Sequence, residues 1–273
     1  MNSLANNDAK DLLLFIIRQL HQELNKKNNN TNLNLSSNKN IDQSNEKDVF
    51  NDFLEDFEKE NQSIISELFY GVNHTITKCS ECKIVKHYFQ AYFFLIFPLE
   101  EVKKLKLIKL MENNNNIMLN QNQKNEKIKS LKESNIDIQD CFEYYYQKVD
   151  KLSGENGMYC LTCQKQLGTT YQTVLYTLPE ILIIIFNKGK VKIKLSEYLN
   201  LNDYAKYGGK YELISVITHN GKSGPYGSFI AICKNPVDHR WYSYINANIT
   251  FVNDFKNDIL NYGTPYILFY KRE

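Results

Sequence analysis

Two pairs of cysteines constrain the fold of this chain more than any other feature. Each pair has two residues between its cysteines, as Cys79-Ser-Glu-Cys82 and Cys160-Leu-Thr-Cys163. This spacing lets two thiolates on one tight turn bind the same metal ion, and two such turns complete a closed tetrahedron. We predict one structural zinc ion held by all four cysteines, which joins two ribbons far apart in sequence. The spacing alone leaves a redox-active pair and an empty site open as alternatives.

The two remaining cysteines have different surroundings. Cys141 stands beside Phe142 in a predicted short helix, and Cys233 lies within an apolar strand pattern. Neither has, nearby in sequence, the histidine and polar orienting residue that would activate a nucleophile. We expect both to pack as small buried residues.

Charge and hydropathy narrow the classes of partner. The chain has 33 basic and 31 acidic residues, so its formal net charge is only +2. The Lys-rich stretch at 103–132 is mixed with Asn and Gln, and we expect it to stay solvated. The longest apolar runs, such as Ile181–Phe186, have strand length, and the first residues lack the features of a signal peptide. We expect an intracellular protein, cytoplasmic or nuclear, that binds neither nucleic acid nor membrane.

Helical patterns precede strand patterns along the chain. A helix after Asp8 is predicted to carry an apolar stripe, and residues 50–69 also have a helical pattern. The stripe comprises Ala9, Leu12, Leu13, Ile16, Ile17, Leu20 and Leu24. A strand is predicted over 88–97, then a short helix capped by Asp140, and from residue 171 a series of short strands rich in β-branched and aromatic residues. This order favours an α+β fold with an antiparallel sheet.

Two low-complexity stretches interrupt these patterns. Residues 25–48 and 112–135 are rich in Asn and contain few apolar side chains. Such segments bury too little apolar surface to fold alone, so we predict disordered insertions in surface loops.

A series of short motifs runs in a fixed order along nearly the whole chain. DAKDL at 8–12 and ELFYG at 67–71 precede the first cysteine pair, and LPE at 178–180 and LSEYL at 195–199 follow the second. The series ends with HNG at 219–221, GSFIA at 227–231, WYSYIN at 241–246 and YILFY at 266–270. In order and spacing these motifs resemble the C-terminal part of the catalytic domain of the ubiquitin-specific proteases, a family of papain-like cysteine deubiquitinases.

The resemblance implies a single domain over 1–273 with three parts. A partial helical thumb would come first, followed by zinc-ribbon fingers at 75–98 and 156–178 and an antiparallel β palm at 179–273. The family's N-terminal cysteine box would lie before Met1. The four paired cysteines would then be the fingertip zinc site, which explains their separation in sequence.

The resemblance also implies where a catalytic triad would lie. In this family a Cys attacks the ubiquitin C-terminal carbonyl, a His takes its proton, and an Asp or Asn orients the imidazole. Asn246 takes the orienting position, Ser228 stands at the histidine position, and the nucleophile has no counterpart. A serine hydroxyl cannot act as a base near neutral pH. His219 matches a position that begins the loop near the ubiquitin tail, and its recruitment as the base is an alternative.

We therefore expect a ubiquitin-binding pseudo-protease that is catalytically inactive as given. Its contacts with ubiquitin would include His219, Gly221, Gly227 and Phe229. One alternative is an active deubiquitinase that cleaves isopeptide bonds when an upstream cysteine box is supplied. Another is a zinc-stapled scaffold that no longer binds ubiquitin. The sequence predicts no oligomeric state.

Overall fold

The computed structural model describes residues 8–26, 45–115, 135–146, 148–187, 191–221 and 227–273. Most of the two Asn-rich stretches therefore lies outside the described residues. The described helices are α1 (Ala9–Leu24), α2 (Glu46–Glu60), α3 (Ile64–Phe69), α4 (Leu99–Asn115), α6 (Ile138–Asp140) and α7 (Phe255–Asp258), with a π-helical turn at Cys141–Tyr146. The strands of the first half are β1 (Gly71–Cys79), β2 (Val85–Tyr92), β3 (Leu95–Phe97), β4 (Ile136–Asp137), β5 (Val149–Leu152), β6 (Met158–Cys160), β7 (Lys165–Leu167) and β8 (Thr169–Thr177). Those of the second half are β9 (Ile181–Phe186), β10 (Ile193–Lys194), β11 (Tyr198–Asn200), β12 (Lys210–Asn220), β13 (Ser228–Lys234), β14 (Trp241–Ile245), β15 (Asn248–Val252) and β16 (Thr264–Arg272).

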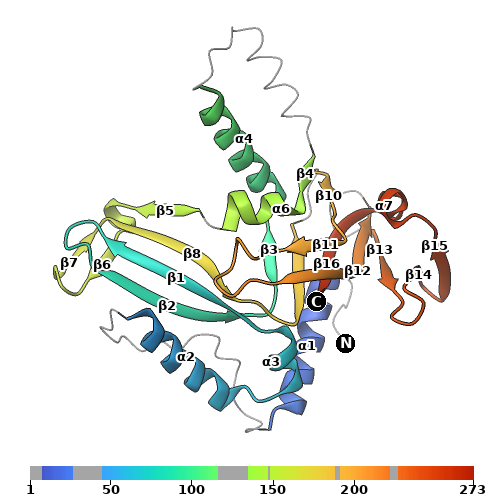
Figure 1. Ribbon diagram of the computed structural model, residues 1–273, viewed down its shortest axis with the longest axis horizontal. Helices are drawn as coiled ribbons and strands as arrows, with labels where there is room; N and C mark the ends of the chain where they lie inside the picture. The colour runs from blue at the N-terminus through green and yellow to red at the C-terminus, as the bar shows by residue number, and fades with distance from the viewer. Residues whose placement is uncertain (1–7, 27–44, 116–134, 147, 188–190, 222–226) are drawn as a thin grey trace, which may run out of the picture.

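Two sheets organise the described part of the chain (Figure 1). A four-stranded antiparallel sheet has the order β2-β1-β8-β5, and β6 and β7 form a hairpin beyond its end. An eight-stranded sheet has the order β15-β14-β13-β12-β16-β9-β3, with β11 also paired to β12. Its pairs are antiparallel except for β3 with β9. Helices and mainly antiparallel sheets confirm the predicted α+β class.

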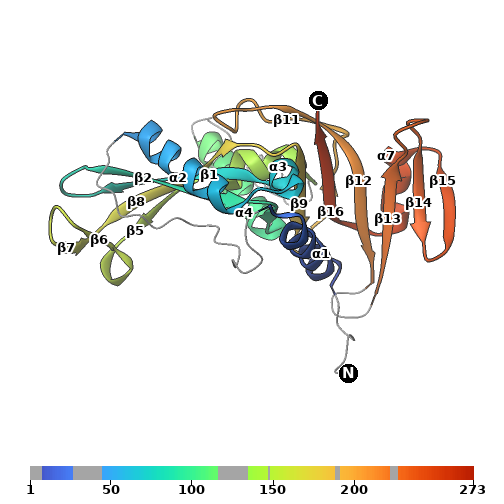
Figure 2. The same cartoon turned by 90° about the horizontal axis from the view of Figure 1, so that it is seen from below.

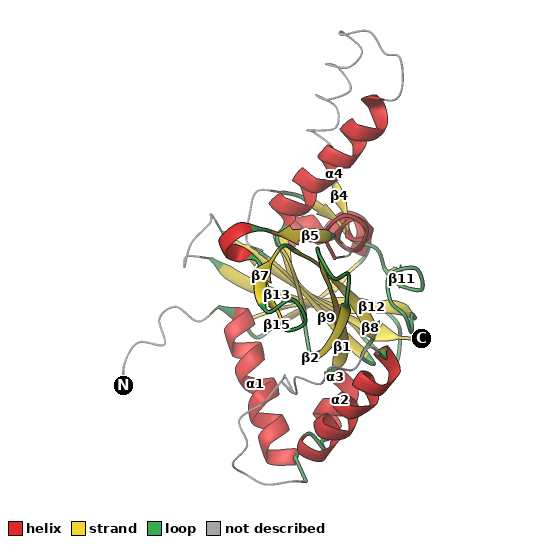
Figure 3. Ribbon diagram, turned by 90° about the vertical axis from the view of Figure 1, so that its left-hand side faces the viewer, coloured by secondary structure: helices red, strands yellow, loops and turns green. Residues whose placement is uncertain are grey.

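The two sheets lie along the long axis of the molecule. Figure 2 shows the β6–β7 hairpin at one end and β14 and β15 at the other. Figure 3 shows α1, α2 and α3 together on one side, with α4 projecting from the opposite side. The four-stranded sheet overlaps the predicted finger segments 75–98 and 156–178, and most of the eight-stranded sheet falls within 179–273.

Strand β9 lies at the centre of the core because it is apolar on both faces. Leu182, Ile184 and Phe186 point into one apolar cluster, while Ile183 and Ile185 point into a second cluster beside α1. All five side chains are at most 1% exposed. Side chains alternate between the faces of a strand, so a continuous apolar run indicates a strand that is covered on both sides.

Helix α1 begins as predicted, but its apolar stripe divides in two. The Asp8 carboxylate accepts from the Lys10 N–H at 3.1 Å and from the Tyr266 hydroxyl of β16 at 2.7 Å. Ile17 is buried against the sheet with Leu13. The predicted stripe residues Leu12, Ile16, Leu20 and Leu24 are instead 41–54% exposed, and Phe15 is 61% exposed. The helical period correctly predicted an apolar side of the helix, but only the part of it with Leu13 and Ile17 is covered by the sheet.

Three predicted element boundaries were wrong. The helical segment 50–69 is two helices, because Ser63 caps α3 by accepting from the Ser66 N–H at 3.1 Å. The strand predicted over 88–97 divides after Tyr92, and β3 pairs with β9 in the other sheet. Asp140 is not the N-cap of α6, since its carboxylate accepts from the backbone N–H of Asp137, the capping residue.

Helix α4 occupies part of the Lys-rich stretch that was expected to stay solvated. It begins after Pro98, which fits the first turn of a helix, and its first-turn acids Glu100 and Glu101 favour the N-terminal dipole. Val102 is fully buried in the core. Lys106 reaches Asp140 at 2.6 Å in a largely buried ion pair. These contacts anchor the start of α4 to the fold.

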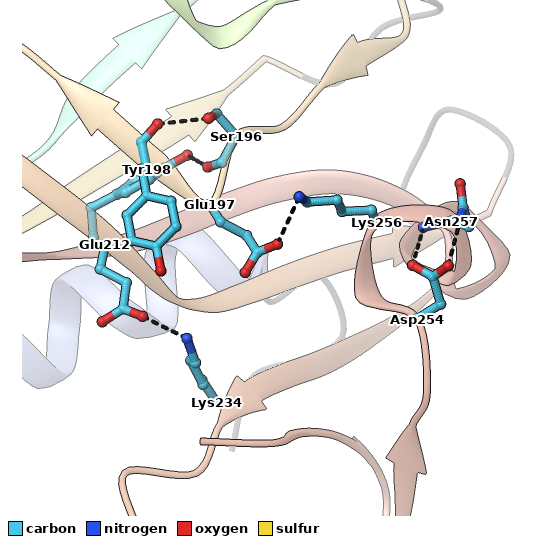
Figure 4. Close-up of polar contacts among 9 residues, drawn as sticks. Ser196, Glu197, Tyr198, Glu212, Lys234, Asp254, Lys256 and Asn257 are labelled. Atoms are coloured by element: carbon cyan, nitrogen blue, oxygen red, sulfur yellow. Dashed lines mark hydrogen bonds and ion pairs between the residues drawn. The ribbon is translucent and has the colours of Figure 1, made fainter.

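Ion pairs join β12 to β13 and α7 to the residue before β11 (Figure 4). Lys234 of β13 lies 2.5 Å from Glu212 of β12. Lys256 of α7 reaches Glu197, beside β11, at 3.5 Å. Pairs near the surface contribute little net stability, so they mainly set the position of these segments.

Candidate functional site

Two turns of matching shape present the four paired cysteines. Cys79 ends β1, and Cys82 lies in the turn before β2. Cys160 ends β6, and Cys163 lies in the turn before β7. The residue after the second cysteine has a positive φ in both turns, 61° at Lys83 and 54° at Gln164. This left-handed residue tightens each turn and directs both thiols of a pair to one point.

The four sulfur atoms meet at that point. All four lie within 4.8 Å of one another, and Cys82 Sγ is 3.6 Å from Cys160 Sγ. Zinc–sulfur bonds of about 2.3 Å in a tetrahedron place sulfur atoms about 3.8 Å apart. Lys165, the first residue of β7, and Glu81, in the first turn, form an exposed ion pair at 2.9 Å across the site. The arrangement fits a closed, four-thiolate metal site and not a disulfide, since all the described cysteines are free.

The thiols of this cluster differ in acidity. A hydrogen bond from the backbone of Cys163 lowers the pKa of Cys160 to about 7. Desolvation, with the neighbouring thiols, raises the pKa of Cys163 to about 12. A bound dication would favour the thiolate form of all four cysteines.

Three adjacent strands bring together the residues predicted for the palm site. The β12–β13 register pairs His219 with Phe229 and Asn220 with Ser228. The β13–β14 register pairs Ala231 with Tyr244, so its continuation brings Asn246 level with Phe229. His219, Ser228 and Asn246 therefore occupy the same end of three neighbouring strands.

These residues differ sharply in exposure. His219 is only 8% exposed and packs against the Phe229 ring, with ring centroids 5.0 Å apart. A Cβ at Gly227 would lie 2.5 Å from His219 Nε2, so glycine lets the chain pass close to that ring. Ser228 and Asn246 are exposed. Gly221 is also exposed, and residues 222–226 after it lie outside the described residues.

Asn246 also has a local structural reason to be asparagine. It lies in the tight turn between β14 and β15 with φ 54°, a left-handed conformation that asparagine adopts more readily than most residues. Strand β15 was not predicted from the sequence. Without it, Asn246 looked like the end of a strand when it is the first residue of a hairpin turn.

The two other cysteines are built into the core and the large sheet. Cys141 is 0% exposed, and burial raises the pKa of its thiol far above the ordinary value. Cys233 Sγ lies 3.2 Å from the Ser215 hydroxyl on the neighbouring strand. Within the described residues, no histidine is a hydrogen-bond partner of either thiol. Neither thiol therefore has the activating surroundings of a nucleophile.

Sequence reasoning missed a second cluster of potential ligands. Glu46, His74 and His87 bring a carboxylate and two imidazoles within 4.8 Å of one another. The alternation of β1 and β2 could have placed both histidines on one face, but their register was needed to show that they meet.

A two-sheet fold with a four-cysteine site at its tip and a histidine-bearing strand end defines the class of the ubiquitin-specific proteases. The family model described as ubiquitin carboxyl-terminal hydrolase matches residues 1–270. The chain belongs to this family, and its fold is the papain-like fold of the family's protease domains.

Relatives and solved structures agree with this assignment. Ubiquitin carboxyl-terminal hydrolase 10 of Saccharomyces cerevisiae is 30% identical over 50% of the chain and 18% of the relative. Ubiquitin carboxyl-terminal hydrolase Usp2 of Drosophila melanogaster is 23% identical over 97% of the chain and 26% of the relative. A structure of the yeast SAGA DUBm has a TM-score of 0.64 at 17% identity, covering 97% of this chain and 50% of that one. A SAGA Ubp8/Sgf11/Sus1/Sgf73 DUB module bound to ubiquitin aldehyde has a TM-score of 0.62 at 17% identity, covering 98% and 49%.

The chain thus spans about a quarter or less of these curated relatives and about half of the matched structural chains. Among the described helices, none is long and apolar enough to cross a membrane.

Proposed function

We propose that this chain binds ubiquitin and is catalytically inactive as given. The observation that carries the proposal is the exposed serine at the family's histidine position, Ser228, at the start of β13. A hydroxyl there cannot take the proton of an attacking thiol near neutral pH. His219, on the next strand, is buried against Phe229, which favours a packing role over that of an exposed base.

The open face of the four-stranded sheet supports a binding role. Helix α2 packs against β2 on one face. The opposite face bears a groove of about 430 Å³, lined by residues that include Thr75, Tyr88, Met158 and Tyr171. Tyrosine and methionine are enriched in protein interfaces. The family assignment and the ubiquitin-bound structural neighbours supply the partner: we infer that this groove contacts the globular body of ubiquitin.

We further propose that the four paired cysteines bind one structural zinc ion and that His219, Gly221, Gly227 and Phe229 contact ubiquitin, with Asn246 at the family's orienting position. The sulfur geometry supports the first proposal. The meeting of these residues at one strand end supports the second. We assign the four-stranded sheet to the fingers, the eight-stranded sheet to the palm and α1 to a partial thumb.

A ubiquitin probe with a C-terminal vinyl-type electrophile tests the inactive assignment. We expect no adduct by mass spectrometry, while an active ubiquitin carboxyl-terminal hydrolase reacts under the same conditions. Ser228→His should also form no adduct, because the cysteines of this chain serve structure. An adduct on any cysteine of the wild type contradicts inactivity, and one that appears only in Ser228→His contradicts the absence of a nucleophile.

The groove is tested by changing one tyrosine. Tyr88→Ala should weaken ubiquitin binding about tenfold or more, as removal of a buried aromatic contact commonly does. Tyr198→Ala is the matched control, since Tyr198 is 61% exposed on β11 in the other sheet. Equal affinities of the two variants by calorimetry would exclude the groove as the contact surface.

A further inference from the structure

A glutamate and two histidines converge where helix α2 meets the four-stranded sheet. Glu46 is the first residue of α2, His74 lies in β1 and His87 lies in β2. Their ligand atoms all lie within 4.8 Å of one another. His74 Nε2 is 2.8 Å from His87 Nδ1, so the two ring nitrogens point toward each other.

The strand register explains why the histidines meet. His74 pairs with Phe89, and His87 lies two residues from Phe89 on the same face of the sheet. That face is the one covered by α2, whose Phe50 packs against Phe89. The His74 ring is 2% exposed and stacks on Phe89 at 4.5 Å, which fixes its orientation.

One further group holds the carboxylate. Lys206 forms an ion pair with Glu46. Lys206 is in turn 3.4 Å from the Tyr176 hydroxyl. A carboxylate held by outer partners is typical of metal sites, where such contacts orient the ligand.

We propose that Glu46, His74 and His87 form a second metal site, which takes a divalent ion of the zinc type. Two imidazoles and one carboxylate are a known zinc ligand set, which leaves one position for water. Zinc–nitrogen bonds of about 2.0–2.1 Å in a tetrahedron place nitrogen atoms about 3.3 Å apart. Binding therefore moves His74 Nε2 and His87 Nδ1 apart from their hydrogen-bonded distance of 2.8 Å and replaces the proton that they share. The bound ion would tie the start of α2 to β1 and β2. This inference is independent of ubiquitin binding.

The charges around the histidine site predict its affinity for a metal ion relative to that of the cysteine site. The positive charge of Lys206 offsets the negative charge of Glu46 at the histidine site. The cysteine site instead offers four negatively charged thiolates to a metal ion. The histidine site should therefore fill second. Lys206→Met removes the opposing charge and should tighten metal binding about tenfold.

Cobalt titration of the metal-free chain separates the two sites by their absorption. Thiolate ligands give an intense cobalt charge-transfer band in the near ultraviolet, which the histidine site lacks. The first equivalent should produce this band, and a second should add only weaker visible absorption. His87→Ala should bind one equivalent with the thiolate band intact, and Glu46→Gln should weaken the second equivalent.

Matched controls complete the experiment. His239→Ala removes an exposed histidine in the turn before β14 and should keep two equivalents. Cys82→Ser should lose the thiolate band and retain the second site. If circular dichroism shows that His87→Ala does not fold, the affinities of Glu46→Gln and Lys206→Met for the second equivalent still test the proposal. One equivalent in the wild type, or a second that neither substitution alters, would overturn the proposal and leave a hydrogen-bonded histidine pair.

Discussion

At the scale of single residues, two buried tyrosines show how much a hydroxyl partner matters. Among the described side chains, the Tyr70 hydroxyl is the buried polar atom without a hydrogen-bond partner, and burial raises its pKa to about 12. The Tyr211 hydroxyl is buried too, but it donates to the Pro179 carbonyl at 2.5 Å. Burial alone therefore does not determine what each hydroxyl contributes to stability.

Removing the two hydroxyls should have opposite results. Tyr70→Phe should leave the free energy of unfolding unchanged or raise it by up to about 1 kcal/mol, because an unpaired buried hydroxyl is unfavourable. Tyr211→Phe should lower it by about 1–2 kcal/mol, because the Pro179 carbonyl loses its partner. Denaturant unfolding of both variants measures the difference. A larger loss for Tyr70→Phe would contradict the predicted order.

A buried histidine predicts acid sensitivity. His21 is 3% exposed and lies 2.7 Å from the Ser63 hydroxyl, and burial lowers its pKa below the ordinary 6.5. The unfolded chain therefore binds the proton more readily than the folded one. Stability is full above about pH 6.5 and falls as the pH drops below it. His21→Gln should reduce the slope of the unfolding free energy against pH between about pH 7 and pH 5, while the buried His74, whose pKa burial lowers to about 4, keeps part of that slope. An unchanged slope would contradict this role of His21.

At the scale of elements, the proposed zinc ion matters most for the β6–β7 hairpin. Its strands have three residues each, and most of them are exposed. A two-stranded hairpin is at best marginally stable alone, so we expect a zinc ion held by the four cysteines to supply most of its order. Cys82→Ser or chelation should sharply increase amide exchange at 158–167, measured by mass spectrometry. Cys233→Ser is the control, and unchanged protection in Cys82→Ser would contradict a structural metal site.

The start of β1 should tolerate no side chain at Gly71. A Cβ there would lie 2.5 Å from the Tyr92 ring and 2.7 Å from the Thr177 carbonyl oxygen. One of these neighbours is backbone and cannot rotate away. Gly71→Ala should lower the unfolding free energy by roughly 1–3 kcal/mol. Thermal unfolding that matches the wild type would show that the sheet relaxes around the new methyl group.

Elements with a strong local pattern could be predicted, and those defined by distant contacts could not. Strand β9 was predicted because five consecutive apolar residues have no alternative to burial on both faces. Helix α4 was missed because its many lysines and asparagines leave no clear apolar pattern, although a few residues such as Val102 reach the core. The break after Tyr92 was missed because β3 exists through its pairing with β9, which lies far away in sequence.

At the scale of the whole molecule, the order of the motifs predicted the family, and the residues alone predicted the four-cysteine cluster. The site at the strand end was predicted as a set of residues, while the burial of His219 beside an exposed Ser228 needed the sheet register. The histidine pair beneath α2 was not predicted, since it forms only when two strands and a helix meet. Local sequence patterns cannot predict side-chain positions that are set by packing between distant elements.

The central claim is that this chain binds ubiquitin without cleaving it. The most direct measurement is an NMR titration of isotopically labelled, isopeptide-linked diubiquitin with the chain. We predict shift perturbations on ubiquitin surface residues and an isopeptide signal that stays constant through prolonged incubation. Absence of perturbations at high protein concentration would leave only a scaffold role, and release of monomeric ubiquitin would contradict the assignment of inactivity.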